Sequence, residues 1–405
     1  MDNGLGLTPP MGWNSWNRFA CNIQEDLIKD TVQAAKSLGL DRLGYVYINL
    51  DDCWQKSRNK YGYIVEDKKA FPSGIPALAE YIHDQGMKFG LYSDAGLFTC
   101  QKRPGSLKYE AQDAATYKEW KIDYLKYDNC WSTLEPVQHR YQTMHDALNK
   151  TGHSIFFSMC EWGVQDPATW APSIGNSWRT TGDINPTWKS WTSILDANDK
   201  WWQQAGPGGW NDPDMLEVDN GRMTFAEQKA HFTMWCLIKA PLLLGMDLRK
   251  ISKAGLEIIS NEGLIQWNQD TLGVQGHRVY QEKVESTAVS PSSSPLLRQR
   301  RLDGSMVQTI TESESELEGG GGDGLIEVWA GPLANGNYAV VLFNRGRKPH
   351  SITADWKDIG LPSAQAMKAT DVWKKQSIGT FASNYTAMVE PHDVIAIQLE
   401  PAFLE

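Results

Sequence analysis

The sequence predicts an α/β fold in two domains, a (β/α)8 TIM barrel followed by an antiparallel β-sandwich. Apolar strand-like runs alternate with helix-like segments up to about residue 276, and such alternation is typical of a parallel sheet. Eight repeats favour a barrel over a doubly wound sheet, and no Gly-x-Gly-x-x-Gly follows the first run. Beyond residue 276 the segments become short, β-branched and separated by Gly, Pro and Asn, which favours a sandwich. A chain of 405 residues is long enough for both domains.

The barrel strands are expected where an apolar run ends in a polar or aromatic cluster. The eight runs cover residues 10–16, 45–53, 88–96, 124–130, 155–163, 177–184, 208–216 and 241–248. Helices are expected between them where apolar residues recur at helical spacing, among others at 25–40, 75–85 and 111–120. The carboxyl ends of barrel strands meet around one mouth, so the polar clusters predict an active site there.

The barrel domain is expected to span 1–276 and the sandwich domain 277–405. Sandwich strands are expected at 325–330, 338–344, 350–354, 385–389 and 393–399. Residues 282–324 interrupt this pattern with a Ser-Pro-rich stretch, a basic cluster, an acidic run and four consecutive glycines. This composition has little apolar surface to bury, so we predict a disordered insertion that proteases cut readily.

Charge and composition argue against some classes of function. A net charge of −10 disfavours nucleic acid and anionic membranes as partners, and no run of 18 apolar residues predicts a membrane-spanning helix. The first residues lack the apolar core of a signal peptide. The chain is then either cytosolic or a mature form with an added initiator Met. Four cysteines near expected strand ends and two glycosylation sequons, at Asn149 and Asn384, favour the mature form, secreted or in the lysosome or vacuole lumen. The sequence leaves the oligomeric state open.

Four of the six cysteines lie at or near expected strand ends, where loops could bring them together as disulfides. They are Cys21, Cys53, Cys100 and Cys130. The alternative is that they are buried free thiols. No Cys-x-x-Cys or His-rich spacing indicates a metal site, and we expect no cofactor.

The run 124–130 is suited to hold a nucleophile. Lys126 and Asp128 are two positions apart, so in a strand both side chains lie on one face. A neighbouring cation is expected to lower the pKa of Asp128 and keep it ionised.

A second catalytic carboxylate is expected at Asp183, after the sixth strand. A glycosidase uses two carboxyl groups that face each other across a pocket, one ionised and the other protonated. Apolar neighbours and the proximity of Asp128 are expected to raise the pKa of Asp183. The alternative is that Asp183 is the N-cap of the following helix.

Asp51 and Asp52 form an adjacent acidic pair at the end of the second strand. In an extended chain only one would face a substrate, whereas a tight turn would let both point into the mouth. Carboxylates accept hydrogen bonds from vicinal sugar hydroxyls. A metal site that adds Asp212 and Asp214 is the alternative, but no loop has the spacing of a calcium site.

The chain contains 18 tryptophans, and five of them lie at expected strand ends: Trp13, Trp16, Trp54, Trp131 and Trp162. Tryptophan packs against the apolar faces of sugar rings while its N–H donates a hydrogen bond. At these five positions a pocket lining is as reasonable as a place in the core.

Six longer motifs carry a resemblance to a known family. They are Pro10-Met-Gly-Trp-Asn-Ser-Trp16, Asp51-Asp-Cys-Trp54, Tyr124-Leu-Lys-Tyr-Asp128-Asn-Cys130, Cys160-Glu-Trp-Gly163, Trp178-Arg-Thr-Thr-Gly-Asp183 and Gly206-Pro-Gly-Gly-Trp-Asn-Asp-Pro-Asp-Met215. With them the chain resembles melibiase-type α-galactosidases, glycoside hydrolase family 27, and in wording it is closest to plant-type members. The resemblance covers residues 3–270 and 325–332.

The resemblance implies a retaining exo-glycosidase that releases terminal α-linked galactose, with Asp128 as nucleophile and Asp183 as general acid/base. It implies galactose-binding roles for Trp16, Asp51, Asp52, Tyr92, Lys126, Cys130, Glu161, Trp162 and Arg179. It also implies the disulfides Cys21–Cys53 and Cys100–Cys130, with Cys160 and Cys236 as buried thiols. The insertion at 282–324 departs from the family.

Related specificities remain open at this stage. Glu161 and Val164 stand where N-acetylgalactosaminidase relatives carry small residues, which favours a free 2-hydroxyl on the sugar. The alternatives on the same scaffold are an α-N-acetylgalactosaminidase or a β-L-arabinopyranosidase. From another class, the alternative is a galactose-binding protein without catalysis, although both proposed catalytic carboxylates are present.

Overall fold

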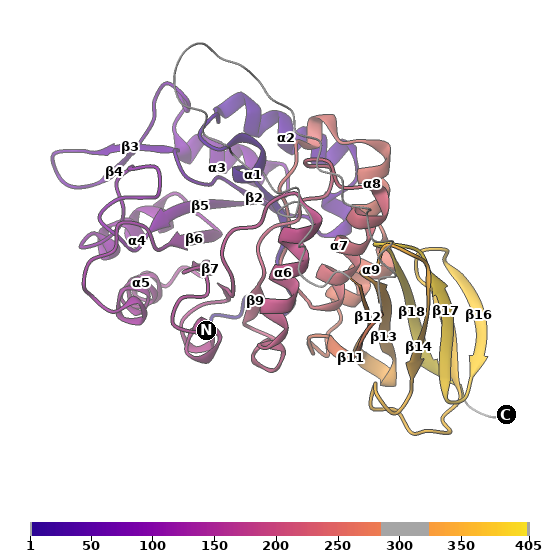
Figure 1. Ribbon diagram of the computed structural model, residues 1–405. Coiled ribbons are helices and arrows are strands. Elements are labelled where there is room, and N and C mark those ends of the chain that lie inside the picture. Colours follow the sequence, from indigo (N-terminus) through magenta and orange to yellow (C-terminus); the bar gives the residue numbers. More distant parts are fainter. Residues whose placement is uncertain (1, 285–323, 403–405) are drawn as a thin grey trace, which may run out of the picture.

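The computed structural model describes residues 2–284 and 324–402 and places them in a barrel and a sandwich that lie side by side (Figure 1). Eight parallel strands form one curled sheet in the order β10-β1-β2-β5-β6-β7-β8-β9. Their bounds are β1 Met11–Asn14, β2 Tyr47–Asn49, β5 Lys88–Asp94, β6 Tyr124–Asp128, β7 Phe156–Cys160, β8 Ser177–Arg179, β9 Trp210–Asp212 and β10 Leu242–Leu244. All eight expected barrel strands are confirmed.

The sheet curls round until its two ends meet. Leu216, just after β9, forms an isolated parallel bridge with Leu244 of β10. The ring is therefore joined at this seam by a single bridge rather than by a full ladder. A short hairpin outside the ring, β3 Gln55–Arg58 and β4 Ile64–Glu66, was not expected from the sequence.

Helices follow the barrel strands and cover the outside of the sheet (Figure 1). They are α1 Trp16–Phe19, α2 Glu25–Ser37, α3 Ile75–Asp84, α4 Glu110–Glu119, α5 Val137–Thr151, α6 Trp188–Asp199, α7 Phe225–Leu237, α8 Lys253–Ile259 and α9 Glu262–Asn268. Helix α2 buries Leu27, Ile28 and Val32, the apolar positions at helical spacing. Helix α7 begins with a capping box in which Thr224 and Glu227 bond reciprocally to each other's backbone N–H. No helix in the described ranges is long and apolar enough to cross a membrane.

Aromatic side chains fill the end of the barrel opposite the mouth. Tyr47, Tyr124 and Phe156 are each the first residue of their strand, and they form one buried cluster. The rings of Tyr124 and Phe156 stack with centroids 4.9 Å apart. This amino-terminal end is packed, and the cavity that holds the expected site residues lies at the carboxyl ends of the strands.

The second domain is an antiparallel sandwich. A six-stranded sheet in the order β11-β12-β13-β18-β15-β16 faces the two-stranded pair β14-β17, and one apolar cluster lies between them. The bounds are β11 His277–Lys283, β12 Leu325–Pro332, β13 Tyr338–Asn344, β14 His350–Asp355, β15 Met367–Asp371, β16 Gln376–Phe381, β17 Asn384–Val389 and β18 Val394–Pro401. The five expected strands are confirmed, whereas β11, β15 and β16 were missed.

The predicted insertion begins too early at its amino end. Glu282 and Lys283 were assigned to the disordered segment, but they belong to β11 and pair with Ile326 and Leu325 of β12. Main-chain pairing to β12 orders these polar residues, although they bury little apolar surface. The rest of the prediction, from 285 to 323, lies outside the described residues.

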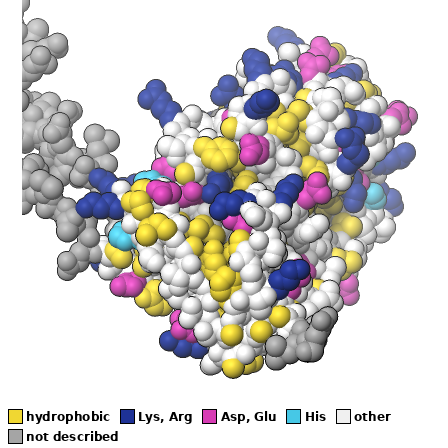
Figure 2. All heavy atoms as spheres, turned by 90° about the vertical axis from the view of Figure 1, so that its right-hand side faces the viewer, with side chains coloured by type: hydrophobic (Ala, Val, Ile, Leu, Met, Phe, Trp, Pro, Cys, Tyr) yellow, Lys and Arg dark blue, Asp and Glu magenta, His cyan; other side chains and the backbone are white. Residues whose placement is uncertain are grey.

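The sandwich packs against the barrel through α7 and through the loop and helix around Trp188. Phe343 of β13 stacks on Trp191 with centroids 5.8 Å apart, and Trp188 stacks on His392 at 4.1 Å. In the view of Figure 2, which faces the sandwich side, cationic and anionic side chains are interspersed rather than gathered by sign.

Candidate active site

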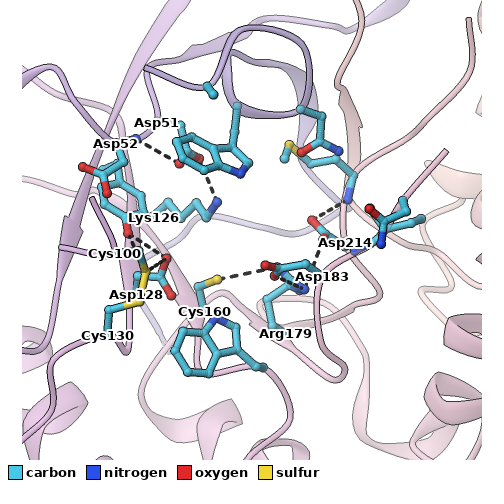
Figure 3. A pocket seen from close by; sticks show the side chains of 18 of the residues that line it. Asp51, Asp52, Cys100, Lys126, Asp128, Cys130, Cys160, Arg179, Asp183 and Asp214 are labelled. Carbon is cyan, nitrogen blue, oxygen red and sulfur yellow. Dashed lines mark hydrogen bonds and ion pairs between the residues drawn. A yellow bond between two sulfur atoms is a disulfide. The ribbon is translucent and has the colours of Figure 1, made fainter. Parts of the chain in front are cut away.

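The mouth of the barrel holds a cavity of about 500 Å³ at the carboxyl ends of the strands (Figure 3). Ten of the eleven site residues expected from the sequence line it: Trp16, Asp51, Asp52, Tyr92, Lys126, Asp128, Cys130, Trp162, Arg179 and Asp183. Of the other tryptophans considered, Trp13 and Trp54 are fully buried in the core, and Trp131 is 51% exposed outside the cavity.

Asp128 ends β6 and is almost completely buried. The hydroxyl of Tyr92 donates to its Oδ2 at 2.7 Å, and the backbone N–H of Asn129 donates to Oδ1 at 2.9 Å. Burial raises the pKa of Asp128 above its ordinary value, and Lys126 and Tyr92 offset only part of this rise. The expectation of a lowered pKa was wrong in direction, because loss of water outweighs the neighbouring cation.

Lys126 is engaged mainly by Asp51. Its Nζ lies 2.7 Å from Asp51 Oδ2, which also accepts a hydrogen bond from Asn14 at 2.9 Å. Burial disfavours the ammonium form, yet the nearby carboxylates, Asp51 first, outweigh it and raise the pKa of Lys126. The cation therefore stays charged and can donate to a ligand bound between β2 and β6.

Asp51 and Asp52 both face the cavity, as the tight-turn alternative predicted. The turn is marked by Cys53, whose φ of 83° lies in the left-handed region. Asp52 accepts from the backbone N–H of Cys53 at 2.7 Å and from that of Gln101 at 2.9 Å. Burial raises the pKa of Asp52 to about 6.

Asp183 lies on the other side of the cavity from Asp51 and Lys126 (Figure 3). Its side chain is 75% exposed and accepts a hydrogen bond from Arg179 Nη2 at 3.1 Å. The helix-cap alternative is wrong, because Thr187 caps the following helix, α6. The apolar surroundings expected for Asp183 are not found either. Its carboxylate lies next to the Arg179 guanidinium and the open cavity.

Asp214 is a cavity residue that was considered from the sequence only as a metal ligand. Its Oδ2 lies 3.0 Å from Arg179 Nη2 and accepts from the backbone N–H of Ile184 at 2.9 Å. Arg179 also donates to the carbonyl of Gly182 at 2.7 Å. The loop that carries Asp183 therefore surrounds the buried guanidinium of Arg179, which also forms an ion pair with Asp214.

Asp94 was also left out of the expected site. It pairs in register with Asp128 across β5 and β6 and is completely buried. It accepts from the backbone N–H of Gly96 at 2.6 Å and of Cys130 at 2.9 Å. Burial, and then the neighbouring Asp128, hold the pKa of Asp94 well above its ordinary range. Its place at a strand end was visible in the sequence, but its role as a link between two loops was not.

Glu161 is the expected site residue that does not line the cavity. It is completely buried, and neither of its carboxylate oxygens has a hydrogen-bond partner among the described residues. Burial raises the pKa of Glu161 well above its ordinary value. At the turn after β7 the chain directs Trp162 rather than Glu161 toward the cavity.

Both implied disulfides are present. Cys21 pairs with Cys53 and Cys100 pairs with Cys130, whereas Cys160 and Cys236 are buried free thiols. The two bridges join the loops after β1 and β2 and those after β5 and β6 around the cavity.

A metal site on the Asp51, Asp52, Asp212 and Asp214 set receives no support from the geometry. Within 2–284 and 324–402, the cluster of potential ligands is instead Asp94, Cys100, Asp128 and Cys130, with one ligand atom of each within 4.8 Å of the others. In that cluster the two sulfurs are already bonded to each other.

Comparisons with known proteins agree with this geometry. Residues 8–270 match the family model described as Alpha galactosidase A, and residues 323–399 match the model of the Alpha galactosidase C-terminal beta sandwich domain. Alpha-galactosidase 2 of Arabidopsis thaliana is 49% identical over 97% of this chain and 89% of its own length.

Solved structures show the same similarity. Alpha-galactosidase I from Mortierella vinacea superposes with a TM-score of 0.87 at 35% identity, covering all of both chains. An alpha-galactosidase from Saccharomyces cerevisiae with raffinose superposes with a TM-score of 0.85 at 31% identity, covering 99% of both chains.

Proposed function

Because this chain belongs to the melibiase-type alpha galactosidase family, we propose that it is a retaining exo-glycosidase that hydrolyses terminal α-linked galactose by double displacement. The observation that carries the proposal is the pair Asp128 and Asp183 on different sides of one cavity closed at its inner end. Their environments differ: Asp128 is buried and held by two donors, while the Asp183 side chain is 75% exposed and contacts Arg179.

In the first step Asp128 attacks the anomeric carbon while the protonated carboxyl of Asp183 gives its proton to the departing oxygen. The product is a galactosyl ester on Asp128. In the second step Asp183 takes a proton from water, which attacks the same carbon and releases Asp128. Two inversions return the sugar to its α configuration. The mechanism requires the two carboxyls to lie about 5–5.5 Å apart.

Recognition of galactose is assigned to the closed end of the cavity. Asp51 and Asp52 can accept from the 4- and 6-hydroxyls, and Lys126 can donate nearby. A site built to bond an axial 4-hydroxyl leaves its own polar groups unpaired when glucose binds, so it rejects that epimer. Trp16 and Trp162 supply apolar surface to the ring.

The pH profile should be bell-shaped, because Asp128 must be ionised and Asp183 protonated. Burial raises the pKa of Asp128, so kcat/KM should fall as the pH drops through that raised value. We expect a mildly acidic optimum, about pH 4–6.

The experiment that tests this function compares hydrolysis of three nitrophenyl glycosides, the α-galactoside, the α-N-acetylgalactosaminide and the β-L-arabinopyranoside. The proposal requires the α-galactoside to be the best substrate. Preference for either of the others would move the assignment to that activity on the same scaffold, and binding of galactose without turnover of any would leave only a binding protein.

The two disulfides also support an oxidising compartment, since such bonds persist in secreted proteins and are rare in the cytosol. We therefore place the protein outside the cell or in the lysosome or vacuole lumen. Four free thiols in active protein purified from its native source would contradict this.

A further inference from the structure

Two acidic side chains and two sulfurs meet at one point of the cavity wall. Cys100 Sγ lies 3.3 Å from Asp128 Oδ2 and 4.0 Å from Asp94 Oδ2. With Cys130 these residues form a group in which one potential ligand atom of each lies within 4.8 Å of the others. Hydrolysis needs the Asp128 carboxylate but not its contact with a cysteine sulfur. We call Asp94, Cys100, Asp128 and Cys130 the sulfur–carboxylate cluster.

The spacing of this cluster is close to that of a tetrahedral zinc site. Zinc bonds are about 2.3 Å long to sulfur and about 2.0–2.2 Å to oxygen, so the ligand atoms of such a site lie roughly 3.3–3.8 Å apart. The two sulfur–oxygen distances agree with this range to within a few tenths of an ångström. In the oxidised protein the sulfurs are bonded to each other, so neither is a thiolate, the form that binds metals.

The two loops that carry the cysteines are joined by their backbones as well as by the disulfide. The Cys130 N–H donates to Asp94 at 2.9 Å, and the Leu97 N–H donates to the Trp131 carbonyl at 3.3 Å. A Cβ on Gly96 would lie 2.0 Å from the Cys130 carbonyl oxygen, so the loops touch at this point. Breaking the sulfur–sulfur bond leaves these contacts in place. The two thiols should therefore stay side by side after reduction.

The charges around the cluster favour a cation. Asp94 and Asp128 pair in register on neighbouring strands, and both are buried. Burial, and then the charge of Asp128, raise the pKa of Asp94 well above its ordinary range. Lys126 offsets only part of the effect of burial on Asp128, and its Nζ is held by Asp51 at 2.7 Å. A divalent ion between the two carboxyls would supply the charge that Lys126 does not.

The Cys100–Cys130 disulfide can be reached through the opening of the cavity. Both cysteines line the cavity wall beside Asp128 (Figure 3). The Cys21–Cys53 disulfide differs, because neither of its cysteines lines the cavity and no comparable group of ligands surrounds it in the described parts of the chain. A small dithiol and a metal ion can thus enter where a substrate enters, and they meet a complete set of ligands at only one of the two disulfides.

We propose that reduction of the Cys100–Cys130 disulfide turns the sulfur–carboxylate cluster into a site for a thiophilic divalent cation, Zn²⁺, that blocks the nucleophile. A dithiol gives two electrons and two protons to the disulfide, which becomes two thiols while the dithiol becomes a cyclic disulfide. The cation then replaces the two thiol protons, which pass to water. Coordination occupies the Asp128 carboxylate, so it cannot attack a sugar. This inference rests on the proposed role of Asp128 and adds a means of regulating it.

The test measures metal binding in the full-length enzyme before and after reduction. Oxidised wild type should bind no Zn²⁺, whereas protein reduced anaerobically with dithiothreitol and then freed of it should bind about one Zn²⁺ per chain by elemental analysis. Co²⁺ in its place should give the absorption of sulfur-to-cobalt charge transfer. Equimolar Zn²⁺ should lower turnover of nitrophenyl α-galactoside by the reduced enzyme about tenfold or more, galactose should compete with it, and a chelator should restore turnover.

Cys100→Ser and Cys21→Ser form a matched pair of variants. The chain has six cysteines, so each variant keeps five thiols after reduction, but only Cys100→Ser removes a ligand of the cluster. Cys100→Ser should weaken Zn²⁺ binding by about 100-fold or more, since even groups that only orient metal ligands are worth about 10–100-fold in affinity. Cys21→Ser should leave Zn²⁺ binding unchanged. Zn²⁺ should raise the melting temperature of reduced Cys21→Ser but not that of reduced Cys100→Ser.

Equal Zn²⁺ binding by the two variants, or by oxidised and reduced wild type, would overturn the proposal and assign the metal to other groups, such as the free thiol of Cys160. A reduced wild type that binds no Zn²⁺, or that no longer melts cooperatively, would overturn it too, because the site needs a folded barrel. Failure of the oxidised wild type to hydrolyse nitrophenyl α-galactoside would instead contradict the proposed function and would leave the result on metal binding intact.

Discussion

Two regions of this protein bury several charged side chains, and they balance charge differently. Where the sandwich meets α6, two cations face three carboxylates: Arg345 and Arg278 against Asp196, Asp199 and Glu327. At the barrel mouth, Lys126 and Arg179 are the cations of the cavity wall, whereas its carboxylates are Asp51, Asp52, Asp128, Asp183, Asp214 and Glu217.

Burial raises carboxyl pKa values in both regions, at the interface that of Asp199 to about 6, but it affects more groups at the mouth. Burial raises the pKa of Asp52 to about 6 and that of Glu217 to about 7, and it also raises that of Asp128. Unneutralised buried carboxylates cost stability, but they supply groups that can exchange protons and bond hydroxyls. The mouth differs from the interface in its larger excess of carboxylates over cations, six against two.

The largest expected effect is on activity at the mouth. Asp128→Asn removes the proposed nucleophile and should lower turnover of nitrophenyl α-galactoside by about 10⁴-fold or more. It also removes a buried charge, so the melting temperature should be equal to or higher than that of the wild type. Steady-state kinetics and calorimetry measure both. Substantial activity in a sample shown by mass spectrometry to be free of deamidation would end the assignment.

At the interface the opposite result is expected. Arg345→Met leaves Glu327 and Asp196 with one cation fewer in a buried place and should cost about 3–5 kcal/mol in the free energy of unfolding. Activity per folded molecule should remain within twofold. The control is Lys357→Met, which breaks an exposed pair with Asp355 and should cost less than about 1 kcal/mol. Equal costs in the two variants would contradict the comparison.

Stability should fall as the pH rises from about 4 to about 7. Asp52, Asp212 and Glu217 have folded-state pKa values of about 6, 6 and 7, above their unfolded values near 4, so the folded state binds more protons in this window. The contribution is complete below the unfolded pKa and is lost as the pH passes the folded one. Calorimetry at pH 5 and pH 7.5 should show the lower melting temperature at pH 7.5, and Asp212→Asn should reduce the difference. A melting temperature that rises over this range would count against raised pKa values.

The smallest effect is expected from deleting residues 285–323. Val284 donates a backbone hydrogen bond to Gly324 at 2.8 Å, so β11 and β12 already meet where the segment begins and ends. A short Gly-containing turn in its place should leave turnover unchanged, and trypsin should cut the native protein first near Arg298 to Arg301. Loss of activity in a deletion variant that still melts cooperatively would assign this segment to the site or to a subunit contact.

The barrel could be predicted because each of its strands is an apolar run with a polar end. The missed strands lack this signal. The edge strand β16 is mostly exposed, and β11 is charged and runs into the polar segment, so neither shows buried alternation. The β3–β4 hairpin is too short for a periodic pattern.

In the site, residue identities were predictable and electrostatics were not. The direction of the pKa shift of Asp128 depends on its burial, and the roles of Asp94 and Asp214 depend on loops that meet only in the folded chain. Glu161 was misplaced for a related reason, because the side on which a residue emerges from a turn is set by local backbone geometry.

The central claim, that Asp128 attacks the sugar in a retaining reaction, is tested most directly by trapping the intermediate. An activated fluorogalactoside whose glycosyl ester hydrolyses slowly should inactivate the enzyme with a stoichiometry of one, and peptide mapping by mass spectrometry should place the galactosyl group on Asp128. A label on another carboxylate, or full activity after prolonged exposure with β-galactose as the first product, would contradict it.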